Sequence, residues 1–265
     1  MKRLGQHFLI NKTKLQKIVE ALDLKPGDAV IEIGPGHGEL TDELRNKNNE
    51  LKLMTIERDN DLVELLKNKF ARDKNLEVVH DDVLKILPDL CLKLHNSNFK
   101  IVGNIPFYIT GYLLRILGEL KNKPSLIVLT VQKEVAERIC AEPPKMNLLA
   151  ASVQFWAEPK IVDYIPKTDF QPQPKVDSAI IKLVVSNQPL ATSENYYKLI
   201  KILFKQPRKT ILNNLASSGK NKEEIIKILE ELKINPADRP QNLSVEQIKK
   251  LIKAGNSTTM KTRTE

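Results

Sequence analysis

The feature that most constrains the fold is an alternation of short apolar runs with helical periodicity over the first two thirds of the chain. Five runs are almost continuously apolar, as in strands that are covered on both faces of a parallel sheet: residues 29–34, 52–57, 76–80, 100–105 and 125–132. Helical periodicity precedes, separates or follows these runs at 12–22, 39–47, 60–70, 110–120 and 133–141. This order predicts an α/β domain with a doubly wound, Rossmann-like sheet.

The second feature is a change of pattern near residue 188. After the apolar run 179–185 and a polar stretch, only helical periodicity follows, at 196–204, 208–217, 223–232 and 245–254. We therefore expect an α/β domain over 1–187 and a smaller, all-helical domain over 188–255. Residues 256–265 have no apolar pattern, and we expect them to be disordered.

Composition indicates the kind of binding partner and the cellular compartment of the protein. Lys and Arg number 42 against 33 Asp and Glu, a formal charge of +9, which favours a polyanionic partner such as nucleic acid. Only Cys91 and Cys140 are present, in no metal-ligand spacing, so we expect neither a disulfide scaffold nor a metal, and a reducing cytoplasm. No stretch approaches the ~18 apolar residues of a membrane span, and we expect no signal peptide.

The first candidate for chemistry is "EIGPGHG", where a strand gives way to a helix. Glycines at 34, 36 and 38 allow a sharp turn and a close backbone approach to a ligand. The spacing departs from the dinucleotide fingerprint, and Glu32 would repel a pyrophosphate but can face a cation. S-adenosylmethionine, with its sulfonium and ammonium, fits Glu32, Gly34 and Gly36 better than NAD does. The alternative is a glycine turn that serves only strand–helix packing.

Two further acidic positions follow the next two predicted strands. Glu57 ends the second strand, where a carboxylate can accept both ribose hydroxyl hydrogens. Asp82 follows the third strand and can accept from an adenine amine, although the neighbouring Asp81 is a rival for this role. Acids at the carboxyl ends of successive parallel strands lie where such sheets bind ligands, so together they support a nucleoside-containing cofactor.

The fourth strand ends in "GNIPFYIT", residues 103–110. The Asn104 side-chain carbonyl and the Ile105 backbone carbonyl can accept the two hydrogens of an adenine N6 amine, directing its lone pair at a methyl donor. Phe107 can stack on a base extruded from its helix, and Pro106 keeps the corner rigid. Taken alone, this tetrapeptide is equally typical of a simple turn.

Together these motifs resemble the ribosomal RNA adenine N6,N6-dimethyltransferases of the kasugamycin-resistance type. The similarity runs over nearly the whole chain, through "LGQHFLIN", "IEIGPGHGELT", "IERD", "DVLK", "GNIPFYIT", "QKEVAERI", "FQPQPKVDSAIIKL" and "DRPQNLSVEQIKKL". The resemblance implies S-adenosylmethionine-dependent dimethylation of two adjacent adenosines near the 3′ end of small-subunit rRNA. It also implies roles for individual residues: cofactor contacts by His7, Leu9, Gly34, Glu57, Asp82 and Asn104, and base contacts by Asn104, Phe107 and Phe170.

Two of these positions, and a basic run in the carboxyl-terminal part, also have ordinary structural interpretations. By its setting in a proline-rich loop before a strand, Phe170 is equally a core anchor. His7 has no triad partner and can simply close the amino-terminal segment over the cofactor. The basic run at Lys205, Arg208 and Lys209 is commonly a solvated face, but in a chain of this charge that faces rRNA we expect phosphate contacts there.

The chain departs from the family pattern at several positions. Pro207 and Leu212 stand where basic residues are common, which predicts weaker RNA affinity. The segment after "AERICAEPP" lacks a common Tyr-Gly pair at the substrate entrance. Phe107 replaces the more usual tyrosine, keeping the stacking face and losing the hydroxyl.

Two other functions remain open at this stage. One is a large-subunit rRNA methyltransferase of the macrolide-resistance type, although "VDSA" and "RPQNLSVEQI" resemble the small-subunit enzymes more. The other is a ribosome-assembly factor that binds small subunits without methylating them. For the leading function we expect a cytoplasmic monomer that acts on rRNA within a pre-assembled small subunit.

Overall fold

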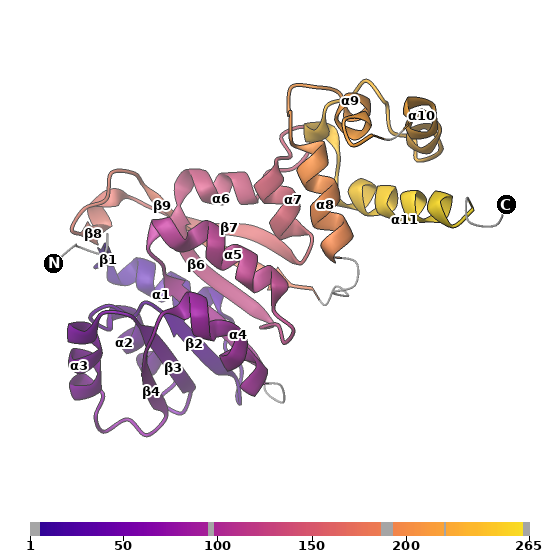
Figure 1. The fold of residues 1–265 in the computed structure, drawn as a ribbon. Helices are drawn as coiled ribbons and strands as arrows, with labels where there is room; N and C mark the ends of the chain where they lie inside the picture. The colour runs from indigo at the N-terminus through magenta and orange to yellow at the C-terminus, as the bar shows by residue number, and fades with distance from the viewer. Residues whose placement is uncertain (1–5, 95–97, 187–192, 220, 262–265) are drawn as a thin grey trace. The chain divides into compact units, whose positions relative to one another are not determined.

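A seven-stranded sheet in the order β4–β3–β2–β5–β6–β9–β7 organises the amino-terminal part of the computed structural model (Figure 1). β9 is antiparallel to both of its neighbours, and the other strands run parallel to one another. The structure describes residues 6–94, 98–186, 193–219 and 221–261. The strands are β1 (Phe8–Leu9), β2 (Ala29–Ile33), β3 (Lys52–Glu57), β4 (Leu76–His80), β5 (Phe99–Asn104), β6 (Leu126–Gln132), β7 (Ala157–Ile165), β8 (Phe170–Gln171) and β9 (Ser178–Val185).

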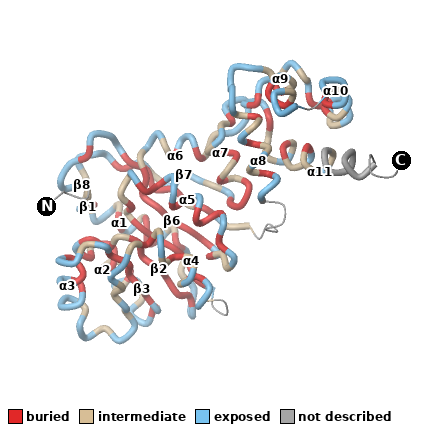
Figure 2. The backbone as a smooth tube through the Cα atoms, in the orientation of Figure 1, coloured by how far each residue is buried: buried red, intermediate tan, exposed pale blue. Residues whose placement is uncertain are grey.

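Helices connect the parallel strands by crossovers, so the predicted doubly wound sheet is confirmed. The helices of this part are α1 (Lys12–Ala21), α2 (Glu39–Lys47), α3 (Asn60–Lys69), α4 (Val83–Lys93), α5 (Thr110–Glu119) and α6 (Lys133–Ile139), with short 3₁₀ helices η1 (Phe107–Ile109) and η2 (Lys167–Asp169). α1 and α2 bury their apolar faces against Val30, Val102 and Val128 of the sheet. Figure 2 shows the central strands buried and the outer surfaces of the helices exposed.

The chain changes direction across the sheet between β2 and β5. From β2 it proceeds outwards to β3 and β4, and it then returns to β5 on the other side of β2. Ile33 at the end of β2 pairs with Gly103 near the end of β5. Ligands of open α/β sheets bind at such a switch point, outside the carboxyl ends of the strands.

Several elements were missing from the sequence prediction. β7 is an edge strand whose exposure alternates along its length and which contains Pro159, so it has no continuous apolar run. α4 contains Pro88, which obscured its helical pattern. β1 and β8 are two residues each and pair with one another across a long separation in sequence, with Phe8 opposite Gln171 and Leu9 opposite Phe170.

The chain divides into two compact units, 1–137 with 157–187 and 138–156 with 188–265. The second contains α7 (Leu148–Gln154), α8 (Ser193–Leu203), α9 (Ile211–Ala216), α10 (Lys222–Glu231), η4 (Pro240–Asn242) and α11 (Val245–Lys261). Segment 138–156 belongs to it because the Phe155 ring stacks on Tyr196 at 4.1 Å, and the Tyr196 hydroxyl donates to the Ala151 carbonyl over 2.9 Å. α11 includes residues 256–261, which we had expected to be disordered, and 262–265 lie outside the described residues.

Candidate active site

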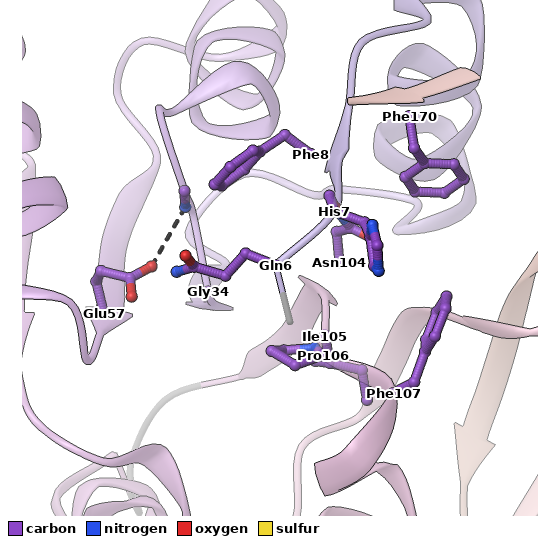
Figure 3. Close-up of a pocket in the computed structure, with 11 residues that line it drawn as sticks. Gln6, His7, Phe8, Gly34, Glu57, Asn104, Ile105, Pro106, Phe107 and Phe170 are labelled. Atoms are coloured by element: carbon purple, nitrogen blue, oxygen red, sulfur yellow. Dashed lines mark hydrogen bonds between the residues drawn. The ribbon is translucent and has the colours of Figure 1, made fainter. Parts of the chain in front are cut away.

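The glycine loop after β2 forms one wall of a pocket at the switch point (Figure 3). Gly34, Gly36 and Gly38 have φ angles of +65°, +61° and +89°, in the left-handed region that favours glycine. A Cβ atom on Gly36 would lie 2.7 Å from the ring of Phe8, so β1 packs directly against the loop. The loop therefore offers its backbone to a ligand beneath an aromatic cover.

Glu57 ends β3 and fixes a carboxylate beside this loop. Its Oε1 accepts from the backbone N–H groups of Arg58 at 2.8 Å and Asp59 at 2.9 Å, and its Oε2 lies 3.4 Å from the Gly36 nitrogen (Figure 3). Burial raises the pKa of Glu57, and these backbone donors oppose the shift. The long contact leaves Oε2 with the capacity to accept from hydroxyl groups in the pocket.

Asn104 ends β5 with its amide in a defined orientation. Its Nδ2 donates to the backbone carbonyl of His7 over 2.9 Å. A carbonyl can only accept, so the side chain must turn its nitrogen toward His7 and keep Oδ1 as an acceptor on its other side. Ile105 and Pro106 follow at the pocket wall. The structure therefore places a fixed side-chain amide, followed by Ile105 and Pro106, at the wall of the pocket.

Aromatic rings lie near this amide on two sides (Figure 3). Phe107 lines the pocket, with the ring of His7 stacked 5.9 Å away. His7 Nδ1 donates to the Pro172 carbonyl over 2.7 Å, which links the amino-terminal segment to the loop that carries Phe170. Phe170 lines the same pocket and also belongs to the hydrophobic core, so its two interpretations are compatible.

Three predicted cofactor residues do not line the pocket. Leu9 is 2% exposed, because β1 turns it to the core when Phe8 covers the loop. Asp82 caps α4 by accepting from the Leu84 N–H at 3.0 Å. Its rival Asp81 is exposed and accepts from the Asp82 N–H at 2.7 Å. Neither residue lines the pocket, so the pocket does not show which of the two would contact the cofactor.

The third is Glu32, which lies within β2 and is 1% exposed. The Thr41 hydroxyl donates to its Oε2 over 2.7 Å, and its Oε1 is buried with no hydrogen-bond partner among the described residues. Burial is the main cause that raises the pKa of Glu32 to about 8. The carboxyl group is therefore held under the loop instead of facing the pocket directly.

The sequence interpretation missed two pocket residues, Gln6 and Phe8. In Figure 3 the side chain of Gln6 extends toward Glu57. Both stand in the stretch "LGQHFLIN", but only the pairing of β1 with β8 brings that stretch over the sheet edge. The close approach of Phe8 to Gly36 marks Phe8 as a pocket residue, but this contact is visible in the folded structure and not in the sequence.

The predicted phosphate-binding side chains lie in the second unit, in the turn between α8 and α9. Lys205, Arg208 and Lys209 are all exposed. The Asn214 side chain, 2% exposed, bonds to four backbone groups of this turn: it donates to the carbonyls of Gln206, Lys209 and Thr210 at 3.0, 3.3 and 3.1 Å and accepts from the Gln206 N–H at 3.2 Å. One buried amide thus fixes the basic turn. The helix itself begins at Ile211, later than the predicted 208.

The described residues hold neither a candidate metal site nor a candidate membrane span. No three of their His, Cys, Asp or Glu side chains are grouped so as to hold a metal ion. Each helix in the described ranges is too short or too polar to span a bilayer.

Comparison with known proteins gives consistent matches over almost the whole chain. The family described as ribosomal RNA adenine dimethylase matches residues 1–256. Proteins named ribosomal RNA small subunit methyltransferase A are similar to it: that of Dehalococcoides mccartyi is 42% identical, covering 94% of this chain and 86% of its own, and that of Fusobacterium nucleatum is 36% identical, covering 95% and 96%.

Two solved structures are similar along nearly their full length. A dimethyladenosine transferase from Plasmodium falciparum has a TM-score of 0.77 at 27% identity, covering 95% of this chain and 98% of its own. The 23S rRNA methyltransferase ErmE has a TM-score of 0.73 at 25% identity, covering 93% and 98%. The fold is therefore shared with a dimethyladenosine transferase and with a 23S rRNA methyltransferase, whereas the relatives quoted above at higher sequence identity bear small-subunit names.

Proposed function

Because the chain belongs to the ribosomal RNA adenine dimethylase family, we propose that its pocket dimethylates the N6 amine of two adjacent adenosines near the 3′ end of small-subunit rRNA. The chain is an S-adenosylmethionine-dependent rRNA adenine dimethyltransferase. The observation that carries the proposal for this pocket is the fixed amide of Asn104, beside Phe107 at the switch point.

The residues around the glycine loop suit S-adenosylmethionine, which supplies a methyl group bonded to a positively charged sulfur. The positive φ of Gly36 and the close approach of Phe8 leave no room for a side chain at position 36, so the loop presents its backbone there. Glu57 would accept from the ribose hydroxyls, and Asp82 would serve the adenine end. Glu32, whose pKa of about 8 leaves it largely protonated at neutral pH, would act on the cation from beneath the loop, without contact, by losing part of its proton when the cofactor binds. His7 and Leu9 would hold the cover strand in place.

The target amine would be oriented by acceptors of this chain. Asn104 Oδ1 and the Ile105 carbonyl would each accept one hydrogen of the adenine N6, which turns the nitrogen lone pair toward the methyl group. Phe107 and Phe170 would stack on the flipped base, and Pro106 would keep the corner rigid. The extra proton on the methylated amine is acidic and can pass to solvent, so no strong general base is required.

RNA binding is assigned to the exposed basic turn of the second unit. Lys205, Arg208 and Lys209 would contact phosphates of rRNA within a pre-assembled small subunit. Pro207 and Leu212 replace basic residues there, so we expect weaker contact at this turn. We also propose that the enzyme is monomeric and cytoplasmic. Gel filtration tests its oligomeric state.

Methyl transfer from radiolabelled S-adenosylmethionine to purified, unmethylated ribosomal subunits tests the proposal. We expect dimethyladenosine after nucleoside digestion of small-subunit rRNA alone. Label in large-subunit rRNA would move the protein to the macrolide-resistance class. Tight subunit binding without label would identify an assembly factor.

A further inference from the structure

The outward face of η1 and α5 carries two tyrosines that have no part in the reaction above. Tyr108 and Tyr112 are 62% and 55% exposed and stand four residues apart, one helical turn. Between them Ile109 is buried, and Leu113 follows at 0% exposure. The segment thus buries its aliphatic side chains and presents its aromatic ones to solvent.

A positive charge extends this face. Arg115 lies three residues after Tyr112, and its side chain is 69% exposed. Its Nε lies 3.0 Å from the Glu119 carboxylate, one turn further along the helix. An exposed ion pair of this spacing contributes little to stability, so the guanidinium can readily exchange the carboxylate for a phosphate. Tyr108, Tyr112 and Arg115 are called the aromatic stripe below.

The stripe begins one residue along the chain from the active-site pocket. Tyr108 directly follows Phe107, which lines that pocket, and consecutive Cα atoms are about 3.8 Å apart. A base held in the pocket has left its stack, and the nucleotides joined to it must emerge at the pocket edge with their faces uncovered. Exposed tyrosines offer such bases a flat partner, and Arg115 offers the backbone a cation.

We propose that the aromatic stripe is a stacking platform for the unpaired nucleotides next to the target adenosine, with Arg115 on a flanking phosphate. The proposal rests on the proposed function and extends its substrate contacts beyond the flipped base. RNA is favoured over a protein partner because the stripe starts at the residue that follows Phe107 of the base pocket and ends in an exposed guanidinium. The tyrosines do not belong to the pocket, so they are expected to act on substrate binding and not on cofactor binding.

Photo-crosslinking identifies the occupant directly. Replacing Tyr108 with the photoreactive residue benzoylphenylalanine keeps an aromatic side chain at the position. The full-length variant is irradiated on unmethylated small subunits, and reverse transcription maps the modified nucleotide. We expect stops within about three nucleotides of the methylated adenosines, the reach of bases that stack on one or two rings. Attachment to a ribosomal protein, or to distant rRNA, would overturn the proposal.

Kinetics provide a second measurement with a matched control. Tyr108→Ala with Tyr112→Ala should lower kcat/KM for small subunits by about 10- to 100-fold, and Tyr108→Phe with Tyr112→Phe, which keeps both ring faces, should change it less than about threefold. The affinity for S-adenosylmethionine should be the same in both variants. If the unaltered enzyme methylates small subunits and the alanine variant does so equally well, the platform is wrong and the function stands. If the unaltered enzyme transfers no methyl group, it is the function that fails.

Discussion

At the amino-terminal edge of the sheet, where the parallel strands begin, a buried ion pair is surrounded by hydrogen-bonding partners. At the carboxyl-terminal edge, where these strands end, the polar side chains are hydrogen-bonded through some of their polar atoms and not through others. Lys100 Nζ lies 2.7 Å from Asp28 and donates to the carbonyls of Leu22 at 2.9 Å and Asp23 at 2.6 Å. Asn98 donates to the other Asp28 oxygen. The Lys100 and Asp28 side chains are 6% and 2% exposed.

At the opposite edge, hydrogen bonds orient the acceptor atoms of the side chains without pairing all of them. Asn104 is held through Nδ2, which sets the orientation of Oδ1, and Glu57 is held mainly through Oε1. Burying polar groups without full pairing costs stability, which is acceptable where a ligand completes the pairing. The difference between these edges predicts that substitutions at one affect folding and at the other affect catalysis.

The largest effect is expected at Asn104. Asn104→Ala removes the oriented acceptor, and methyl transfer should fall by about 10³-fold or more, because orientation of the amine and carbonyl electrostatics carry the reaction. Stability should fall by only about 1 kcal/mol, since one hydrogen bond to the His7 carbonyl is lost. Single-turnover kinetics and urea unfolding measure the two quantities. A variant that keeps its activity would remove Asn104 from the reaction.

The converse is expected at Lys100. Lys100→Met leaves Asp28 buried beside no cation and should lower the free energy of unfolding by about 3–5 kcal/mol. Adding Asp28→Asn removes the unpaired charge and should recover part of the loss. Activity per folded molecule should stay within about twofold of the unaltered enzyme. A large loss of activity in the folded double variant would show that the two edges are coupled.

Glu32 is an intermediate case, because it is buried and incompletely hydrogen-bonded but does not line the pocket. Its folded pKa of about 8 exceeds the ordinary value of 4.5. Between these values the folded protein binds more protons than the unfolded one, so stability falls as pH rises through this window. We expect a loss of about 2–3 kcal/mol from pH 5 to pH 8, given about 1.4 kcal/mol per unit of pKa displacement and some structural relaxation.

The matched variant Glu32→Gln keeps an acceptor for Thr41 and cannot ionise. Its denaturation midpoint should therefore exceed that of the unaltered protein at pH 8 and approach it near pH 5. Calorimetry in two buffers tests the proposed influence on the cofactor: binding of a cation should release part of a proton from the unaltered protein at pH 7 and none from the variant. Parallel pH curves would contradict the raised pKa of Glu32, and equal proton release would exclude its influence on the cation.

The sequence predicted the sheet well where strands are buried on both faces. The bounds of β3, most of whose residues are buried, agree with the predicted 52–57. Those of β4 agree with the predicted 76–80, although β4 is an edge strand whose residues are partly or fully exposed. β7 escaped prediction because one of its faces is solvated and its pattern is interrupted. Segment 138–156 could not be assigned to the second unit, because the stacking of Phe155 on Tyr196 joins residues 41 positions apart in the numbering.

The same reasoning applies to the site. Glu57 and Asn104 were predictable because strand ends of a parallel sheet meet at one edge. Gln6 and Phe8 were not, because contacts far apart in sequence bring β1 to the pocket: its pairing with β8 and the hydrogen bond from Asn104 to the His7 carbonyl. Glu32 was assigned to the ligand from its charge, and its orientation depends on Thr41, a contact that the motif does not contain.

The smallest effect concerns Asn214, which sharpens the comparison because it is fully paired like Lys100 but supports an exposed, ligand-facing turn. Asn214→Ala removes side-chain hydrogen bonds to three carbonyls and one N–H of the basic turn, and RNA affinity should fall by about 5- to 10-fold, because ordering the freed backbone costs about 1 kcal/mol or more. Asn213→Ala is the matched control, since that side chain is exposed one residue earlier on α9.

Salt dependence separates a disordered turn from a lost charge. Replacing Lys205, Arg208 and Lys209 by Ala should lower the slope of log affinity against log salt by about 2, since each phosphate contact adds roughly 0.7–0.9 to it. Asn214→Ala keeps all three charges, so it should weaken binding at every salt concentration with a smaller change in slope. An Asn214 variant that unfolds the second unit yet leaves subunit affinity unchanged would mean that this amide, like Lys100, serves the fold alone.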